Sequence, residues 1–179
     1  MRGDHPLVQI VDAGLAEAAR KAGDWLACRP GCFECCLGPF PISPEDADRL
    51  RRGLAEADPA VAARVISRAR QSLARLHRDY PVDTIARVLE EDGAAADEPC
   101  PVLDPATGTC DLYAARPITC RTFGPALRYR DGPLAVCELC FVGATEEEIA
   151  ACSVDLDLDP PGEETLLVAQ ALVPESGEA

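Results

Sequence analysis

The chain has 179 residues, of which 47% are apolar, so it is long enough for one globular domain or for a domain with a dependent subdomain. Its formal net charge is −14, from 31 acidic and 17 basic residues, and such a field repels nucleic-acid phosphates and anionic lipid surfaces. We therefore expect neither nucleic acid nor a membrane as a partner. Because no apolar run resembles a signal peptide or a membrane span, we also expect a cytoplasmic location.

The N-terminal half has the spacing of apolar residues that is typical of helices. Ser43-Pro44 and Asp58-Pro59 each combine an N-cap residue with proline at the first helical position. The predicted helices cover residues 6–27, 44–57, 59–80 and 82–89. An acidic, alanine-rich linker follows at residues 93–97. Five arginines of the third helix are interpreted mainly as a solvated outer face; they are Arg64, Arg68, Arg70, Arg75 and Arg78.

After the linker the pattern changes to short segments separated by turns. Residues 100–113 predict a hairpin, because Asp104 to Gly108 supply turn chemistry, and residues 127–136 predict a second one around Asp131-Gly132. A short helical turn is expected after Arg116-Pro117, and Thr145 is expected to cap a helix that reaches about residue 151. Alternation over residues 154–158 indicates an edge strand.

Ten cysteines are the most informative feature of the sequence. Disulfides are rare in a reducing cytosol, where tightly spaced thiols more often bind metal. Four of them lie within nine residues, at Cys28, Cys32, Cys35 and Cys36. Cys152 stands apart and is interpreted as a small buried residue.

Within the first cluster, a helical turn would place Cys32, Cys35 and Cys36 on one face, and Pro30-Gly31 would let Cys28 fold back over them. Because consecutive side chains diverge, we expect Cys35 and Cys36 to reach two different metal ions, or two irons of one cluster.

The remaining cysteines form two further groups. The first hairpin is expected to bring Cys100 and Cys110 together, with Cys120 on the turn that follows. Cys137-x-x-Cys140 has the spacing of a metal knuckle and is expected near Cys120, at the base of the second hairpin.

In this order the motifs resemble those of the YkgJ-type cysteine cluster proteins. The matching motifs are Cys28-x3-Cys32-x2-Cys35-Cys36, Ser43-Pro44-Glu45, Cys100-Pro101-x-Leu103-Asp104, Gly108-x-Cys110-x-x-Tyr113 and Arg116-Pro117-x-x-Cys120-Arg121-x-Phe123. The resemblance spans roughly residues 28–140 and implies a zinc- or iron-chelating domain. This family often has a cysteine shortly after the phenylalanine, where this chain has Gly124-Pro125. Cys137 or Cys140 would then supply the eighth ligand.

We therefore expect a compact, metal-stapled single domain, mainly α with small β-hairpins (α+β). Its helical part would span residues 1–92, its hairpin-rich cysteine part residues 98–142, and its C-terminal helix, strand and tail residues 143–179. The expected function is metal binding through seven or eight thiolates, drawn from Cys28, Cys32, Cys35, Cys36, Cys100, Cys110, Cys120, Cys137 and Cys140. Arg116 and Arg121 are expected to donate hydrogen bonds to the thiolates.

The identity of the metal centre has two interpretations. Cysteine pairs two to four residues apart favour tetrahedral zinc, with two ions per chain. The dense run from Cys28 to Cys36 also fits iron or a [4Fe–4S] cluster.

Two alternatives concern activity. One is an enzyme that uses an iron–sulfur cluster, such as a protein methylase or an oxidoreductase, since a flagellin lysine N-methylase family carries a similar cluster. The other is a metal-free thiol redox protein that exchanges through Cys137 and Cys140, although no βαβ pattern surrounds that pair in the sequence. A protein partner stays unidentified.

Overall fold

The computed structural model describes residues 5–39, 41–81, 88, 93–130, 132, 134–157 and 166–173. The chain forms two compact units, each built from two separate stretches of sequence. The first unit comprises Met1–Arg29 and Ile118–Gly162, and the second comprises Pro30–Pro117 and Glu163–Ala179. These units do not follow the three consecutive parts expected from the sequence, and the single-domain organisation stays a prediction.

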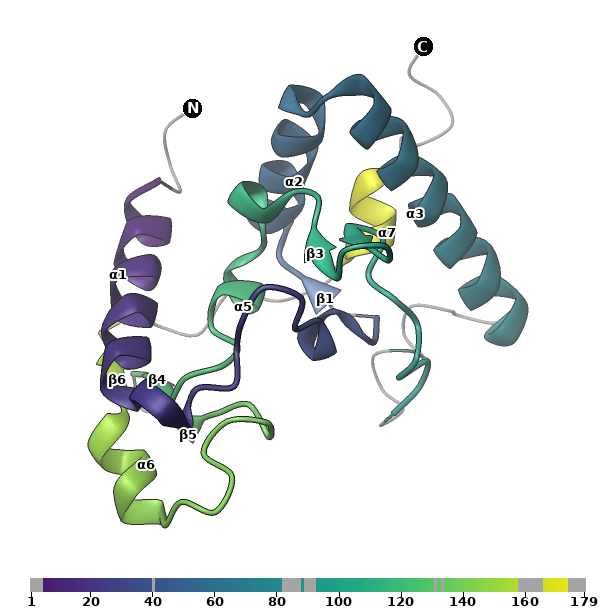
Figure 1. Ribbon diagram of the computed structural model, residues 1–179. Coiled ribbons are helices and arrows are strands. Elements are labelled where there is room, and N and C mark those ends of the chain that lie inside the picture. Colours follow the sequence, from purple (N-terminus) through teal and green to yellow (C-terminus); the bar gives the residue numbers. More distant parts are fainter. Residues whose placement is uncertain are drawn as a thin grey trace. The chain divides into compact units, whose positions relative to one another are not determined.

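The first unit is a long helix packed on a small mixed sheet. Its elements are α1 (His5–Ala22), η1 (Gly23–Trp25), α5 (Ile118–Arg121), β4 (Leu127–Tyr129), β5 (Leu134–Ala135), α6 (Glu146–Cys152) and β6 (Val154–Leu156). The strand order is β5-β4-β6, with β4 antiparallel to β5 and parallel to β6. Helix α1 lies along β4 and β6 (Figure 1), and its Val11 and Ala18 pack against Leu127 and Leu156.

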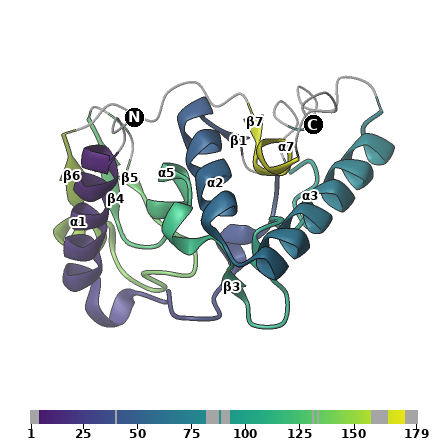
Figure 2. The ribbon, with the colours of Figure 1, turned by 90° about the horizontal axis from the view of Figure 1, so that it is seen from above.

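The second unit is a helical layer that carries two small β-pairs. Its elements are η2 (Glu34–Cys36), β1 (Pro41–Ile42), α2 (Pro44–Glu56), α3 (Pro59–Asp79), β2 (Leu103–Asp104), β3 (Thr109–Cys110), η3 (Tyr113–Ala115), β7 (Leu166–Leu167) and α7 (Val168–Leu172). Helix α7 lies between α2 and α3 (Figure 2). Leu50, Val65 and Leu172 from these three helices meet in the core, which also contains Cys100.

The predicted fold class, mainly helical with small β-hairpins, is confirmed. Both proline-started helices begin where expected, because the Ser43 Oγ accepts from the Asp46 N–H at 3.2 Å and the Asp58 carboxylate accepts from the Ala60 N–H at 2.8 Å. Thr145 caps α6 in a capping box with Glu148.

Some boundaries and pairings differ from the expectation. The first helix ends at Ala22 rather than near residue 27, because Gly23 adopts a left-handed φ of 50° that an α-helix cannot continue through. The two hairpins form as β2–β3 and β4–β5. The β1–β7 pair and the five-residue helix α7 were not predicted. The helix expected at residues 82–89 lies mostly outside the described residues.

No helix in the described part of the chain has the length and apolar character needed to cross a membrane.

Two helical glycines mark close packing and allow a matched test. A Cβ on Gly53 of α2 would lie 2.3 Å from the Cβ of Ala115, which is fixed to the backbone of η3. A Cβ on Gly14 of α1 would lie 2.4 Å from the Leu156 Cδ2, the far end of a flexible side chain. Overpacking costs roughly 1–3 kcal/mol, against a gain of about 1 kcal/mol for alanine over glycine in a helix.

We therefore expect Gly53→Ala to lower the free energy of unfolding, measured by chemical denaturation. Gly14→Ala serves as the control and should be tolerated better, because the Leu156 side chain can rotate away. A Gly53→Ala protein that is as stable as the wild type would contradict the packing of η3 on α2.

Candidate metal centre

The ten cysteines are all free thiols and are divided evenly between the two units. The first unit contains Cys28, Cys120, Cys137, Cys140 and Cys152, and the second contains Cys32, Cys35, Cys36, Cys100 and Cys110. The sequence cluster that begins at Cys28 is therefore split after Arg29, and its last three cysteines join those of the first hairpin.

Main-chain hydrogen bonds hold η2 against the segment that precedes β2. The Cys100 N–H donates to the Cys36 carbonyl at 2.8 Å, and the Gly38 N–H donates to the Glu98 carbonyl at 2.7 Å. Leu37 and Pro99 form an antiparallel bridge between these bonds. Cys36 and Cys100, 64 residues apart in the sequence, are thus fixed side by side by the backbone alone.

Four thiols share this neighbourhood, and those of Cys35 and Cys36 are hydrogen-bonded to each other. A hydrogen bond from the Cys36 thiol lowers the pKa of Cys35 to about 7, and the Cys35 N–H and the charge of Arg116 act in the same direction against burial. The same bond, burial, and the negative charges of Cys35, Cys100 and Cys110 raise the pKa of Cys36 far above its usual range. The expected divergence of the two side chains is not seen, because their thiols are hydrogen-bonded to each other within the 3₁₀ turn η2.

The other two thiols come from the first hairpin. Burial raises the pKa of Cys100 to about 12, and burial also raises the pKa of Cys110. Cys110 is paired across the hairpin with Leu103 rather than with Cys100, which lies just before β2. Both cysteines contact the same apolar core, so the hairpin does bring them into one environment, as expected.

Cys32 is placed differently from the prediction. Because η2 starts only at Glu34 and is a 3₁₀ turn, Cys32 does not share a helical face with Cys35 and Cys36. Its segment instead packs against the hairpin turn, where a Cβ on Gly108 would lie 3.1 Å from the Gly31 carbonyl oxygen.

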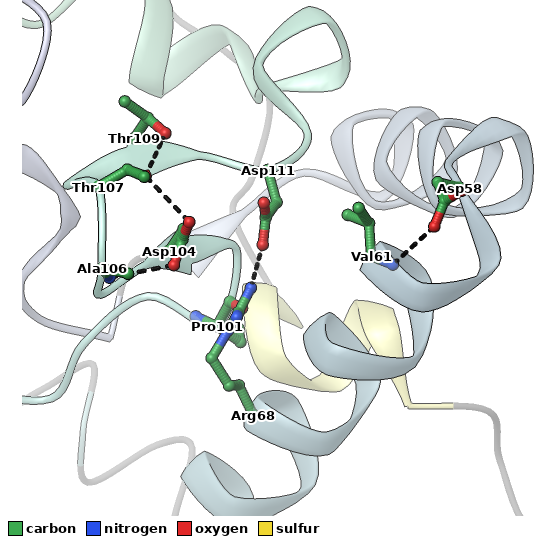
Figure 3. A network of polar contacts seen from close by, with 9 residues as sticks. All are labelled: Asp58, Val61, Arg68, Pro101, Asp104, Ala106, Thr107, Thr109 and Asp111. Atoms are coloured by element: carbon green, nitrogen blue, oxygen red, sulfur yellow. Dashed lines mark hydrogen bonds and ion pairs between the residues drawn. The ribbon is translucent and has the colours of Figure 1, made fainter.

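Two arginines of α3 hold the cysteine-bearing segment in place, and one of them, Arg68, is drawn in Figure 3. The Arg68 Nε donates to the Pro101 carbonyl at 2.8 Å, and its terminal nitrogen pairs with Asp111. Pro101 and Asp111 are the immediate neighbours of Cys100 and Cys110 in the chain. Arg75 forms a two-pronged pair with Glu98, at 3.0 and 2.6 Å. The solvated interpretation is therefore wrong for Arg68 and Arg75.

Sequence reasoning missed these contacts although one signal was present. Arg68 and Arg75 are seven residues apart, which places them two turns apart on one face of a helix.

Hydrogen bonds within the turn stabilise the first hairpin, since the Asp104 carboxylate accepts from the Ala106 N–H and the Thr107 hydroxyl, both at 3.0 Å (Figure 3).

The two arginines expected near thiolates have different surroundings. The Arg116 guanidinium lies 4.0 Å above the centre of the Tyr113 ring. Its charge helps to lower the pKa of Cys35, and at Cys110 it opposes the larger effect of burial, which raises the pKa of that thiol. Arg121 is buried and donates to both carboxylate oxygens of Asp12, at 2.8 and 2.7 Å, which joins α5 to α1. Its hydrogen bond to sulfur stays a prediction.

The Cys137-x-x-Cys140 pair lies on a turn of the first unit. In the chain, β4 precedes this pair, and α6 and then β6 follow it. Because β4 and β6 are parallel, these elements form a βαβ arrangement that the sequence pattern did not predict. In thiol-exchange sites the reactive cysteine sits at a helix N-terminus, which lowers its pKa. Here α6 begins only at Glu146, and burial raises the pKa of Cys137. The geometry does not favour the redox interpretation.

Thiols suit soft metal ions such as zinc, and the four clustered in the second unit match the number of ligands in a closed tetrahedral site. Across the described ranges, no three His, Cys, Asp or Glu side chains are already arranged around a point that could hold a metal ion. The donor chemistry therefore fits a metal, while the final ligand geometry is not preformed.

Comparison with known proteins found one family. Residues 27–138 match the CxxCxxCC family, described as "Putative zinc- or iron-chelating domain". The matched span contains the four clustered thiols of the second unit together with Cys28, Cys32, Cys120 and Cys137. Neither the curated proteins nor the solved structures gave a match. Because the match covers more than half of the chain, the protein belongs to the CxxCxxCC family.

Proposed function

We propose that this protein binds zinc through cysteine thiolates, and that Cys35, Cys36, Cys100 and Cys110 of the second unit form one site. The observation that carries the proposal is the pair of main-chain bonds that joins η2 to the segment before β2, since it brings cysteines from two distant stretches together without a metal.

Electrostatics support a cation at this place. The hydrogen bond with Cys35 raises the pKa of Cys36, and burial raises the pKa of Cys100 and Cys110, while the negative charge of neighbouring thiolates acts in the same direction at all three. A divalent cation replaces the thiol protons and reduces the charge of four thiolates to about −2. Arg116, whose charge already acts on Cys35 and Cys110, offsets part of the remainder.

The origin of the four donors supports zinc over an iron–sulfur cluster. Two come from η2 and two from the hairpin segment, as in closed zinc sites built from two cysteine pairs. Iron–sulfur clusters usually take three or four ligands from one dense run of sequence. Zinc bound in this way supplies a structural cross-link. The chain's own residues hold the donors: α3 fixes the hairpin segment through Arg68 and Arg75.

The first test is the metal content of a ligand variant. Cys110→Ser should lower the bound zinc relative to the wild type, measured by elemental analysis of protein purified without oxygen. Cys152→Ser is the matched control, because Cys152 lies in the first unit and donates only to the Lys21 carbonyl, at 3.3 Å, among the contacts described for its thiol. Equal zinc in Cys110→Ser and the wild type would refute the ligand assignment, and a brown, iron-containing protein would refute zinc.

Removal of the metal should destabilise the protein severely. Structural zinc contributes roughly 10–16 kcal/mol of apparent binding free energy in small peptides, as much as the whole stability of a typical domain, roughly 5–15 kcal/mol. A strong chelator should therefore abolish or greatly lower the thermal unfolding transition, followed by circular dichroism. An unchanged midpoint after the metal has been stripped would show that the fold does not depend on it.

Arg68 should influence metal affinity without being a ligand. Arg68→Ala removes the bonds to Pro101 and Asp111 that fix the positions of Cys100 and Cys110. We expect the zinc dissociation constant, measured by competition with a chromophoric chelator, to rise about 10-fold, as is typical when groups that orient ligands are removed. Arg70→Ala, an exposed position of the same helix, is the control and should leave the constant unchanged. If both variants bind like the wild type, α3 does not position the site.

A further inference from the structure

The loop between β5 and α6 of the first unit presents apolar side chains to solvent (Figure 1). Val136, Leu139 and Val142 of this loop are 38, 45 and 73% exposed. Trp25, the only tryptophan of the chain, is 37% exposed, and its carbonyl accepts from the Phe141 N–H of the loop at 3.0 Å. We call Trp25, Val136, Leu139 and Val142 the turn patch. Exposed apolar patches with a polar rim mark interaction sites on proteins.

Main-chain hydrogen bonds hold the backbone that carries the turn patch. The Cys137 N–H donates to the Gly124 carbonyl at 3.2 Å, and the Cys140 N–H donates to the Cys137 carbonyl at 2.9 Å. The Ala144 N–H donates to the Phe141 carbonyl at 3.0 Å. Because the loop already has a fixed course, a partner would bind it at a small cost in conformational entropy.

The centre of the loop has an unusual backbone conformation. Phe141 adopts a left-handed φ of 58°, which bulky residues rarely do. Its side chain is buried and its ring stacks on that of Trp25, with the ring centres 6.4 Å apart. The next residue, Val142, is the most exposed large apolar side chain among the described residues. Strained backbone that the surrounding contacts maintain is concentrated at functional sites.

Acidic residues surround the turn patch in the sequence. Glu138 lies within the loop, Asp24 precedes Trp25, and Glu146 and Glu147 begin α6; all four are exposed. From residue 131 to residue 179 the chain has no Lys, Arg or His. Within four positions of Trp25 there are two basic residues, Lys21 and Arg29, and the Lys21 ammonium donates to the Ser153 carbonyl at 2.9 Å. The rim of the patch is therefore predominantly negative.

From this combination we propose that the turn patch docks a basic segment of another protein, one that carries apolar side chains between its lysines or arginines. The apolar side chains would cover the patch, and the positive charges would face Asp24 and Glu138. The acidic rim disfavours phosphate-rich partners such as nucleic acids and anionic lipids. It also disfavours a second copy of this chain, because a two-fold interface would place the acidic rims against each other.

The experiment is a fluorescence titration of the full chain, purified without oxygen, with a synthetic peptide of leucine and lysine that has its leucines at helical spacing. Trp25 reports on the patch, and its emission should shift to shorter wavelength as the peptide covers it. An otherwise identical peptide with glutamate in place of lysine should not bind. Raising the salt concentration from about 50 to 500 mM should weaken binding several-fold, since it screens exposed charges.

Substitutions in the patch distinguish docking from general attraction to an acidic protein. Val142→Glu and Leu139→Glu should each weaken peptide binding about 10-fold or more, because both introduce a charge into an apolar contact. Ile10→Glu is the matched control, since Ile10 is 49% exposed on α1, and it should bind like the wild type. Circular dichroism of each variant checks that it is folded.

Three results would overturn the proposal. The first is equal affinity of Val142→Glu and the wild type for the leucine–lysine peptide. The second is equally tight binding of the glutamate peptide. The third is a wild-type dimer, measured by analytical ultracentrifugation, that Val142→Glu dissociates, since the patch would then bind a second copy of the chain.

Discussion

The short antiparallel contact between η2 and the segment before β2 is the constraint on which the second unit's site depends. Its two main-chain hydrogen bonds, from Cys100 to Cys36 and from Gly38 to Glu98, need no side chain and no metal. Once it forms, Cys36 and Cys100 are neighbours, Cys35 follows on the same turn, and β2–β3 returns the chain to Cys110. Arg68 and Arg75 then attach this assembly to α3, and through α3 to the apolar core.

Several arginines of this acidic chain lie beside the segments that carry cysteines. The net charge of −14 disfavours a further group of negatively charged thiolates, and these arginines supply positive charge and hydrogen bonds close to the cysteines. Arg116 acts on Cys35 and Cys110 through its charge, while Arg68 acts through hydrogen bonds to the residues beside Cys100 and Cys110. The first unit uses a similar device, since Arg121, next to Cys120, is held by Asp12.

Local features of the fold could be predicted because the sequence encodes them within a few residues. Ser43-Pro44, Asp58-Pro59 and Thr145 each satisfy orphan N–H groups of the helix that follows, so the starts of three helices were predictable. Both hairpins were predictable for the same reason, from their turn residues. In contrast, strands β1 and β7 are more than 120 positions apart in the chain and pair through only two residues each. No local sequence pattern predicts this pairing.

Cysteine spacing nominated the thiols as metal donors but could not predict how the fold groups them. The division of the first cluster after Arg29 depends on contacts made by Gly124 and by the Cys100 segment, about 100 and 70 residues away. The expected helical face of Cys32, Cys35 and Cys36 assumed α-helical geometry, whereas a 3₁₀ turn that begins at Glu34 excludes Cys32. Long-range backbone contacts, rather than sequence spacing, decide which thiols meet.

The central claim is that cysteine sulfurs alone coordinate a zinc ion in this protein. X-ray absorption at the zinc edge, on wild-type protein purified without oxygen, measures this most directly. Four sulfur neighbours at about 2.3 Å per zinc are the expected result. Nitrogen or oxygen neighbours at about 2.0–2.1 Å, or iron in place of zinc, would contradict it.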